Sequence, residues 1–155
     1  LFPNEETRQY AEYVPLDTLY QECDIISLHT NATPENYHLI NRDAIARMKD
    51  GVILINTARG TLMEPEALVE GLESGKIGAA GLDVVEQENG LFYYNHAGEA
   101  LQNRELAMLR SFPNVVFTPH TAFYTDVNVA HMVESAFQAT RAFAMGEPCP
   151  TEVKL

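Results

Sequence analysis

Short apolar runs alternate along this chain with stretches in which apolar residues recur every three or four positions. The short runs predict strands and the stretches of helical period predict helices. The predicted strands are 24–29, 52–55, 79–85 and 115–118, the predicted helices are 16–22, 41–48, 65–74, 103–109 and 126–145, and most of 1–13 and 30–36 is polar loop. Strands and helices in alternation predict βαβ units around a parallel sheet, and hence an α/β fold that ends in a long helix.

Polar residues stand where two of the predicted helices begin. Asp17 is in a capping position for the helix at 16–22, and Asn41 is a candidate N-cap for the helix at 41–48. Side chains of this kind accept hydrogen bonds from the free N–H groups of a first helical turn. Both residues therefore support the predicted helix starts.

The most informative stretch is 51–60. Its apolar run 52–55 predicts a strand buried on both faces, as in a parallel sheet, and the run stops at the sequence Asn-Thr-Ala-Arg-Gly. In open α/β sheets, ligands bind at the carboxyl ends of the strands. Arg59 is therefore a candidate ligand-binding residue, although a surface arginine in a loop is the alternative.

The segment 86–103 breaks the alternation. Three consecutive aromatic residues, 92–94, are flanked by Gly90 on one side and by Asn95, His96 and Gly98 on the other. The segment has neither a helical nor a strand period. A loop of this length inside a domain is functional, disordered or a wrong assignment of elements.

Composition narrows the class of protein. The chain has 155 residues, of which 46% are hydrophobic, enough for the core of one domain. A net charge of −12 argues against nucleic acid and anionic membrane surfaces as partners, and no apolar run reaches the length of about 18 residues that a spanning helix needs. Cys23 and Cys149 lie far apart and outside any metal-binding spacing, which favours a reducing cytoplasm and predicts no metal site.

Three residues with complementary chemistry follow three successive predicted strands: Arg59, Glu88 and His120. Parallel strands end at one edge, so the three side chains are expected to converge on one cleft. A histidine can exchange the hydroxyl proton of a 2-hydroxy acid, a carboxylate can fix its tautomer, and a guanidinium can hold the substrate carboxylate. The alternatives to a catalytic role are a structural loop histidine for His120 and a solvated acidic loop for Glu88. The remaining histidines are expected to be structural: His29, His38, His96 and His131.

Three segments carry a family resemblance. Residues 56–60, 81–88 and 113–120 resemble, in order and spacing, the signature segments of the NAD-dependent D-2-hydroxyacid dehydrogenases. The resemblance runs from Leu1 to about Val153. Within the family, the aromatic residues 92–94 and the segment 119–125 are similar to the D-lactate dehydrogenase branch rather than to phosphoglycerate dehydrogenases.

The resemblance implies roles for individual residues. Arg59 would bind the substrate carboxylate, His120 would be the proton donor and acceptor, and Glu88 would be its acidic partner, with Glu86 pointing away. The implied cofactor is NAD, bound by Thr30, Asn31, Asn36, Thr57, Ala58, Arg59 and Asp83, with Asp83 at the nicotinamide carboxamide. Phe123 and Tyr124 would lie near the substrate side chain. The expected partners are a small 2-keto or 2-hydroxy acid and a second copy of the chain.

The chain contains no G-x-G-x-x-G, the glycine-rich turn that holds a pyrophosphate at a helix N-terminus. We therefore expect residues 1–125 to be the second half of a Rossmann-like NAD-binding domain, and 126–155 to return toward a substrate domain. Since the chain begins with Leu1, we expect it to be part of a longer protein.

The expected activity of that protein is reduction of a pyruvate-like 2-keto acid to a D-2-hydroxy acid, with this chain inactive alone. The alternatives are a truncated chain that only dimerises and a corepressor-like module that senses NAD. The aromatic loop at 92–94 disfavours the corepressor. The exact 2-keto acid stays open.

Overall fold

The computed structural model describes residues 5–95, 98, 103–149 and 151–152. The chain divides into two compact units, Leu1–His120 and Thr121–Leu155. The first unit holds the sheet, and the second holds the long C-terminal helix. The expected return of residues 126–155 toward a substrate domain stays a prediction.

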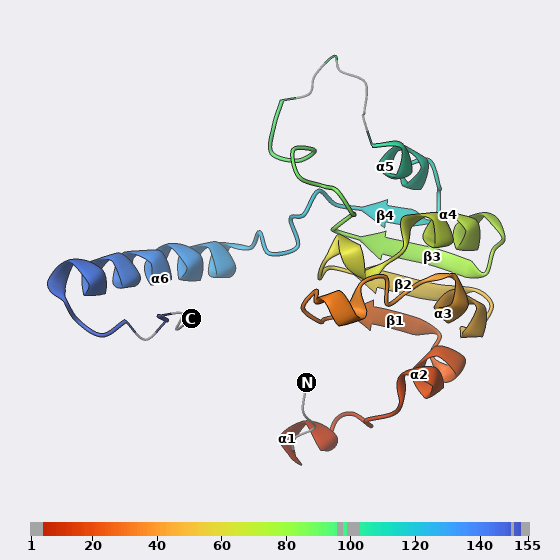
Figure 1. Cartoon of the computed structure of the whole chain (residues 1–155), viewed down its shortest axis with the longest axis horizontal. Coiled ribbons are helices and arrows are strands. Elements are labelled where there is room, and N and C mark those ends of the chain that lie inside the picture. The colour runs from red at the N-terminus through yellow and green to blue at the C-terminus, as the bar shows by residue number, and fades with distance from the viewer. Residues whose placement is uncertain (1–4, 96–97, 99–102, 150, 153–155) are drawn as a thin grey trace. The chain divides into compact units, whose positions relative to one another are not determined.

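The first unit is built on a parallel four-stranded sheet whose strands lie side by side in chain order (Figure 1). The strands are β1 (Ile25–Leu28), β2 (Val52–Asn56), β3 (Ile77–Leu82) and β4 (Val115–Phe117). All three pairings are parallel, so the carboxyl ends of the strands share one edge. The predicted α/β class and parallel sheet are confirmed.

The third strand differs from its prediction at both ends. It was expected at 79–85, but pairing begins at Ile77, opposite Val52, and ends at Leu82, opposite Phe117. Val84 is buried although it lies beyond the ladder. The apolar run therefore continued past the strand because its last residues pack into the core without pairing.

Helices and short 3-10 turns connect the strands. The helices of the first unit are α1 (Glu5–Arg8), α2 (Leu16–Glu22), α3 (Arg42–Arg47), α4 (Pro65–Glu73) and α5 (Arg104–Leu109), and the 3-10 turns are η1 (Pro34–Asn36) and η2 (Gly60–Leu62). Asn41 caps α3 as predicted, because its Oδ1 accepts the N–H of Ala44 at 2.9 Å. Asn103 caps α5 in the same way, through the N–H of Leu106 at 2.8 Å. Turn η1 lies within the expected 30–36 loop.

The predicted capping role of Asp17 is wrong. The N-cap of α2 is Pro15, which makes no side-chain capping bond. Asp17 lies inside the first turn, and its carboxylate forms an ion pair with Arg47 of α3 instead. An acidic residue in the first turn still complements the helix dipole.

The hydrophobic core lies on one face of the sheet. Alternate strand residues such as Ile26, Val52 and Leu54 pack there with buried residues of α2, α3, α4 and α5. On the opposite face, Ile25, Ile53 and Val116 are exposed. The prediction that 52–55 is buried on both faces is therefore wrong for the described residues, because only one face is covered by helices.

The second unit is dominated by α6 (Asp126–Met145), which has the predicted bounds. The Thr125 hydroxyl accepts the N–H of Asn128 at its start, and Gly146 ends it with a left-handed φ of +67°. Phe137 and Phe143 are exposed. Within the part of the chain that the structure describes, no helix is both long and apolar enough to cross a membrane.

Candidate active site

Backbone hydrogen bonds tie three loops together at the carboxyl edge of the sheet. The N–H of Asp83 donates to the carbonyl of Asn56 at 2.9 Å, and the N–H of His120 donates to the carbonyl of Asp83 at 2.7 Å. The N–H of Thr118 donates to the carbonyl of Leu82 at 2.9 Å. The pairing of β2, β3 and β4 thus extends past the strands, and the loops that carry Arg59, Glu88 and His120 start in register.

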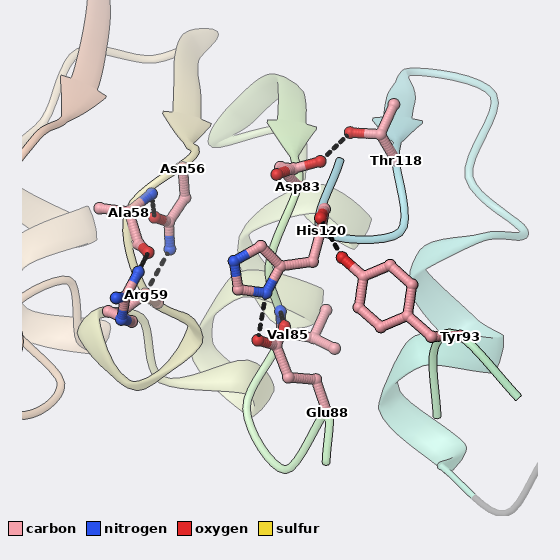
Figure 2. Close-up of polar contacts among 9 residues, drawn as sticks. All are labelled: Asn56, Ala58, Arg59, Asp83, Val85, Glu88, Tyr93, Thr118 and His120. Carbon is pink, nitrogen blue, oxygen red and sulfur yellow. Dashed lines mark hydrogen bonds and ion pairs between the residues drawn. The ribbon is translucent and has the colours of Figure 1, made fainter. Parts of the chain in front are cut away.

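Asn56 shapes the loop that carries Arg59. The residue is only 1% exposed. Its Oδ1 accepts the N–H of Ala58 at 3.0 Å, and its Nδ2 donates to the carbonyl of Arg59 at 2.9 Å. The exposed guanidinium of Arg59 donates from Nη1 to the carbonyl of Ala58 at 2.7 Å (Figure 2). Thr57 is exposed and Ala58 half-buried.

Gly60 brings this loop against the one that follows β3. A Cβ added at Gly60 would lie 2.1 Å from the carbonyl carbon of Val85 and 2.4 Å from the nitrogen of Glu86. No real side chain fits at such distances. The absence of a side chain at Gly60 therefore sets the spacing between the Arg59 loop and the Glu86–Glu88 turn.

Glu88 and His120 form a half-buried pair. Nδ1 of His120 lies 2.7 Å from Oε1 of Glu88, with side-chain exposures of 32% and 21%. The other oxygen, Oε2, accepts the N–H of Val85 at 3.1 Å. Because a carboxylate can only accept, Nδ1 of His120 is the donor, and this contact defines the orientation and tautomer of the ring.

The backbone of His120 is held in an unusual conformation. Its φ is +52°, in the left-handed region that residues other than glycine adopt infrequently. The N–H of His120 is shared between the carbonyls of Asp83 and Thr118. The carbonyl of His120 accepts a hydrogen bond from the Tyr93 hydroxyl (Figure 2). Such conformations occur where surrounding contacts impose them, often at functional sites.

Asp83 is a buried acid at the end of β3. It is 3% exposed, and the Thr118 hydroxyl donates to its Oδ1 at 2.5 Å. A buried carboxylate at the edge of a parallel sheet is a suitable acceptor for an amide N–H, so its chemistry fits the predicted contact with a carboxamide.

The other predicted cofactor residues lie in the loop after β1. Thr30 and Asn31 are exposed. Asn36 folds the loop on itself, because its Nδ2 donates to the carbonyl of Asn31 at 2.7 Å and its Oδ1 accepts the N–H of Thr33 at 2.8 Å. The strand-end loops thus present hydroxyl and amide groups suited to a ribose or adenosine, which fits a dinucleotide lying across this edge.

Other residues that the sequence analysis named have contacts of their own, and Glu86 points to partners other than His120, as expected. Glu86 accepts hydrogen bonds from Tyr37 and His38. Phe123 and Tyr124 belong to the second unit, where their rings meet edge to face at 6.1 Å. His96 lies outside the described residues, among which no cluster of His, Cys, Asp or Glu is placed to hold a metal ion.

The structure adds three residues that the sequence pattern did not single out: Asn56, Tyr93 and Thr118. Asn56 had a usable signal, because an asparagine that ends a strand commonly bonds to the backbone two residues later. Thr118 had the weaker signal of a hydroxyl between a strand and Pro119. Tyr93 belonged to the aromatic run 92–94 that supports the family resemblance, but nothing in the sequence pattern indicated a contact with His120.

Comparisons with known proteins agree with this geometry. A family model described as D-isomer specific 2-hydroxyacid dehydrogenase, NAD binding domain, matches residues 2–122. An aromatic 2-oxoacid reductase of Clostridium sporogenes is 49% identical over 98% of the chain, and a D-lactate dehydrogenase of Leuconostoc mesenteroides is 47% identical over 94% of it. The chain spans 46% and 44% of these two relatives, about half their length.

Solved structures show the same likeness. The crystal structure of a D-lactate dehydrogenase from Treponema pallidum superimposes with a TM-score of 0.94 at 39% identity, covering 99% of this chain and 46% of that one. An NAD-complexed D-isomer specific 2-hydroxyacid dehydrogenase from Lactobacillus delbrueckii gives a TM-score of 0.90 at 34% identity, covering 99% and 47%.

Proposed function

Because this chain belongs to the D-isomer-specific 2-hydroxyacid dehydrogenase family and matches the model of its NAD-binding domain over residues 2–122, we propose that it supplies the catalytic residues that reduce a 2-keto acid to a D-2-hydroxy acid. The observation that carries the proposal is the 2.7 Å contact between His120 and Glu88 at the strand edge. Arg59 lies on the neighbouring loop, which shares the backbone hydrogen bonds of that edge.

The residues of the strand edge would hold the cofactor. Asp83 would accept from the nicotinamide carboxamide, and Thr30, Asn31, Asn36, Thr57, Ala58 and Arg59 would line the rest of its cleft. The reduced cofactor, NADH, would supply the hydride that the reduction requires. This chain contributes substrate binding, orientation and the proton.

His120 would act as the general acid. Its Nδ1 donates to Glu88, so the proton that reaches the carbonyl oxygen of the keto acid is the one on Nε2. The negative charge of Glu88 favours the imidazolium that must form before this transfer. In the reverse direction the neutral ring accepts the hydroxyl proton at the same nitrogen.

Arg59 would bind the substrate carboxylate. Its guanidinium is exposed and donates to the neutral carbonyl of Ala58. Exchanging that acceptor for a carboxylate gives a charge-assisted, bidentate hydrogen bond, which is stronger and sets the direction of the bound acid.

The proposed substrate is a pyruvate-like 2-keto acid, with Phe123 and Tyr124 near its side chain. An aryl 2-oxo acid is the second candidate, favoured by the 49% identity to a relative named as an aromatic 2-oxoacid reductase. We propose a homodimer as the working assembly. We also propose a cytoplasmic location, because Cys23 and Cys149 are free thiols.

A chimera tests the reaction. Residues 1–155 would replace the matching segment of the Leuconostoc D-lactate dehydrogenase, and NADH oxidation would be followed with pyruvate and with phenylpyruvate. The chimera should reduce at least one of them. His120→Gln should lower kcat by about 10²–10⁴-fold with NADH affinity unchanged, since general acid–base catalysis contributes about that much.

Arg59→Lys in the chimera should mainly raise KM for the keto acid, because an ammonium cannot reproduce the bidentate fork. A folded chimera that binds NADH but reduces neither acid would reject the proposal. It would favour the alternative of a non-catalytic module that senses NAD or only dimerises.

A further inference from the structure

A second histidine–glutamate pair lies beside the first. Glu86 and Glu88 stand on the same turn, separated by Gln87. Glu88 contacts His120, which follows β4, whereas Glu86 contacts His38, which follows η1. The turn is therefore held by one histidine from each of two distant parts of the chain. The proposed reaction uses only one of them.

The contacts of Glu86 use both carboxylate oxygens. Nε2 of His38 donates to Oε2 at 2.9 Å, and the Tyr37 hydroxyl donates to Oε1 at 2.8 Å. His38 and Glu86 are 23% and 15% exposed. The rings of Tyr37 and His38 stack, with centroids 3.8 Å apart and planes at 19°. These three residues are called the Glu86 clamp below.

The Glu86 clamp is anchored to the segment that follows Arg59. The N–H of His38 donates to the carbonyl of Thr61 at 2.9 Å, and Ile40 forms an isolated parallel bridge with Met63. His38 itself has a left-handed φ of +52°. The clamp thus connects the η2 segment to the turn that carries Glu88.

The turn between the two glutamates depends on such contacts. Gln87 has a φ of +56°, a left-handed conformation that residues other than glycine adopt infrequently and at an energetic cost. Glu88 reaches back to the N–H of Val85 at 3.1 Å and so closes the turn around Gln87. A turn with a left-handed residue at its centre relaxes when its flanking contacts are removed.

Two acids of neighbouring helices, Glu66 of α4 and Glu105 of α5, lie near the Glu86 clamp. The hydrogen bond from Tyr37 to Glu86 raises the pKa of the Tyr37 hydroxyl, with smaller contributions from desolvation and from the charges of Glu86 and Glu66. Burial raises the pKa of Glu105, and the charges of Glu66 and Glu86 raise it further. The Glu105 carboxyl of α5 therefore lies within electrostatic reach of Glu86, while Tyr37 and His38 supply one hydrogen bond to each oxygen of the Glu86 carboxylate.

We propose that His38, supported by Tyr37, is a positioning residue that holds Glu86 and thereby places Glu88 against His120. The inference rests on the proposed function for its catalytic meaning, because it acts through the proposed proton donor. It assigns a role to a histidine that the sequence pattern left as structural.

The test uses the 155-residue chain with its histidine rings labelled with ¹⁵N. NMR would follow the His120 ring, and in particular the Nδ1 proton that is hydrogen-bonded to Glu88. Glu88→Gln supplies the reference for a broken ion pair. In His38→Leu, the His120 ring signal should move from its wild-type position toward the position that it has in Glu88→Gln. His38→Gln keeps an N–H at similar reach and should restore it.

His131→Leu is the matched control, because His131 is exposed on α6, and it should leave the His120 signal unchanged. A folded His38→Leu variant with wild-type His120 signals, even if it melts earlier, would overturn the proposal and leave the clamp a purely structural tie. If His38→Leu does not fold, Tyr37→Phe and Glu86→Gln keep the packing and are judged by the same signal.

The NMR result needs no turnover, so the two proposals fail separately. If the His120 signal moves in His38→Leu but the chimera is inactive, the positioning role is kept and the proposed reaction is rejected. An unchanged signal beside an active chimera would do the reverse.

Discussion

His120 projects its imidazole from a left-handed backbone that neighbouring groups hold in place. The Tyr93 hydroxyl fixes its carbonyl, and the carbonyls of Asp83 and Thr118 fix its N–H. Glu88 then orients the ring. If His120 is the proposed proton donor, a ring held in this way does not need to reorganise when substrate arrives, which is the advantage of a preorganised site.

Removing the charge of Glu88 should move the pH dependence of the reaction. If His120 is the proposed proton donor, reduction requires the cationic form of its ring, and a carboxylate anion in contact with an imidazole stabilises a cation there. In the chimera, Glu88→Gln should keep a hydrogen-bond acceptor but lose the charge. The pH above which kcat falls should therefore move toward acid, as measured by a pH–rate profile.

Glu134→Gln, on the exposed surface of α6, is the control and should leave the profile where it is. An unshifted profile in Glu88→Gln would mean that the carboxylate does not assist the proton donor.

At the scale of elements, the strand-end loops depend on close backbone approach. Gly60 has room for no side chain, because the backbone of Val85 and Glu86 lies against it. By contrast, Gly81 on β3 is open enough that an added Cβ would make ordinary contacts with Ile55 at 3.8 Å. The two glycines provide a matched pair for testing this packing.

Gly60→Ala should lower the free energy of unfolding by about 1–3 kcal/mol, because overpacking forces the backbone apart. It should also displace the Glu86–Glu88 turn. Urea denaturation measures the first effect and the ¹⁵N signal of the His120 ring measures the second. Gly81→Ala should change neither, and equal behaviour of the two variants would contradict the close contact.

The acid on α5 makes stability depend on pH. Burial, and then the charges of Glu66 and Glu86, raise the pKa of Glu105. Such a carboxyl binds its proton more tightly in the native than in the unfolded state, so its contribution to stability is present at low pH and is lost as the pH rises through the native pKa. The free energy of unfolding of Glu105→Gln, relative to that of the wild type, should therefore increase as the pH rises from about 4 to about 7.

Urea unfolding of both proteins at each pH measures this difference. Glu12→Gln, in an exposed loop, should differ from wild type by a similar amount at both pH values. A Glu105→Gln effect that is constant with pH would show that burial does not penalise the charge.

The elements were predictable where a local signal was strong. The helix Leu16–Glu22 and the helix Asp126–Met145 have the predicted bounds, because proline and apolar periodicity mark them. The end of β3 was not predictable, since Val84 is as apolar as a paired strand residue. Burial of β2 on both faces was inferred from its continuous apolar run, and an apolar run does not say which faces other elements cover.

The candidate site shows the same limit. Arg59, Glu88 and His120 could be placed at one edge because a parallel sheet brings strand ends together. The support given by Tyr93 and by the Glu86 clamp depends on loop conformation with left-handed residues at Gln87 and His38, for which the sequence carries no periodic signal.

At the scale of the whole molecule, cofactor affinity should be low in this chain alone. It has the strand-end loops but no G-x-G-x-x-G, so it lacks the N–H groups that bind the pyrophosphate. Titration of the chain with NADH, followed by fluorescence, should show no saturation at micromolar concentrations. The intact Leuconostoc relative is the control, and micromolar binding by this chain would contradict the prediction.

The order of the sheet, β1-β2-β3-β4, has a consequence for folding. Each strand pairs with the next strand along the chain. Every pairing therefore closes only the loop between two consecutive strands, and no pairing depends on a strand that comes later in the sequence. Assembly can then proceed from β1 to β4, and the strand before Arg59 is in place earlier than the strand before His120. On this route His120 is the last of the three residues to be positioned, and a folding intermediate that lacks β4 would hold the proposed carboxylate binder without the proposed proton donor.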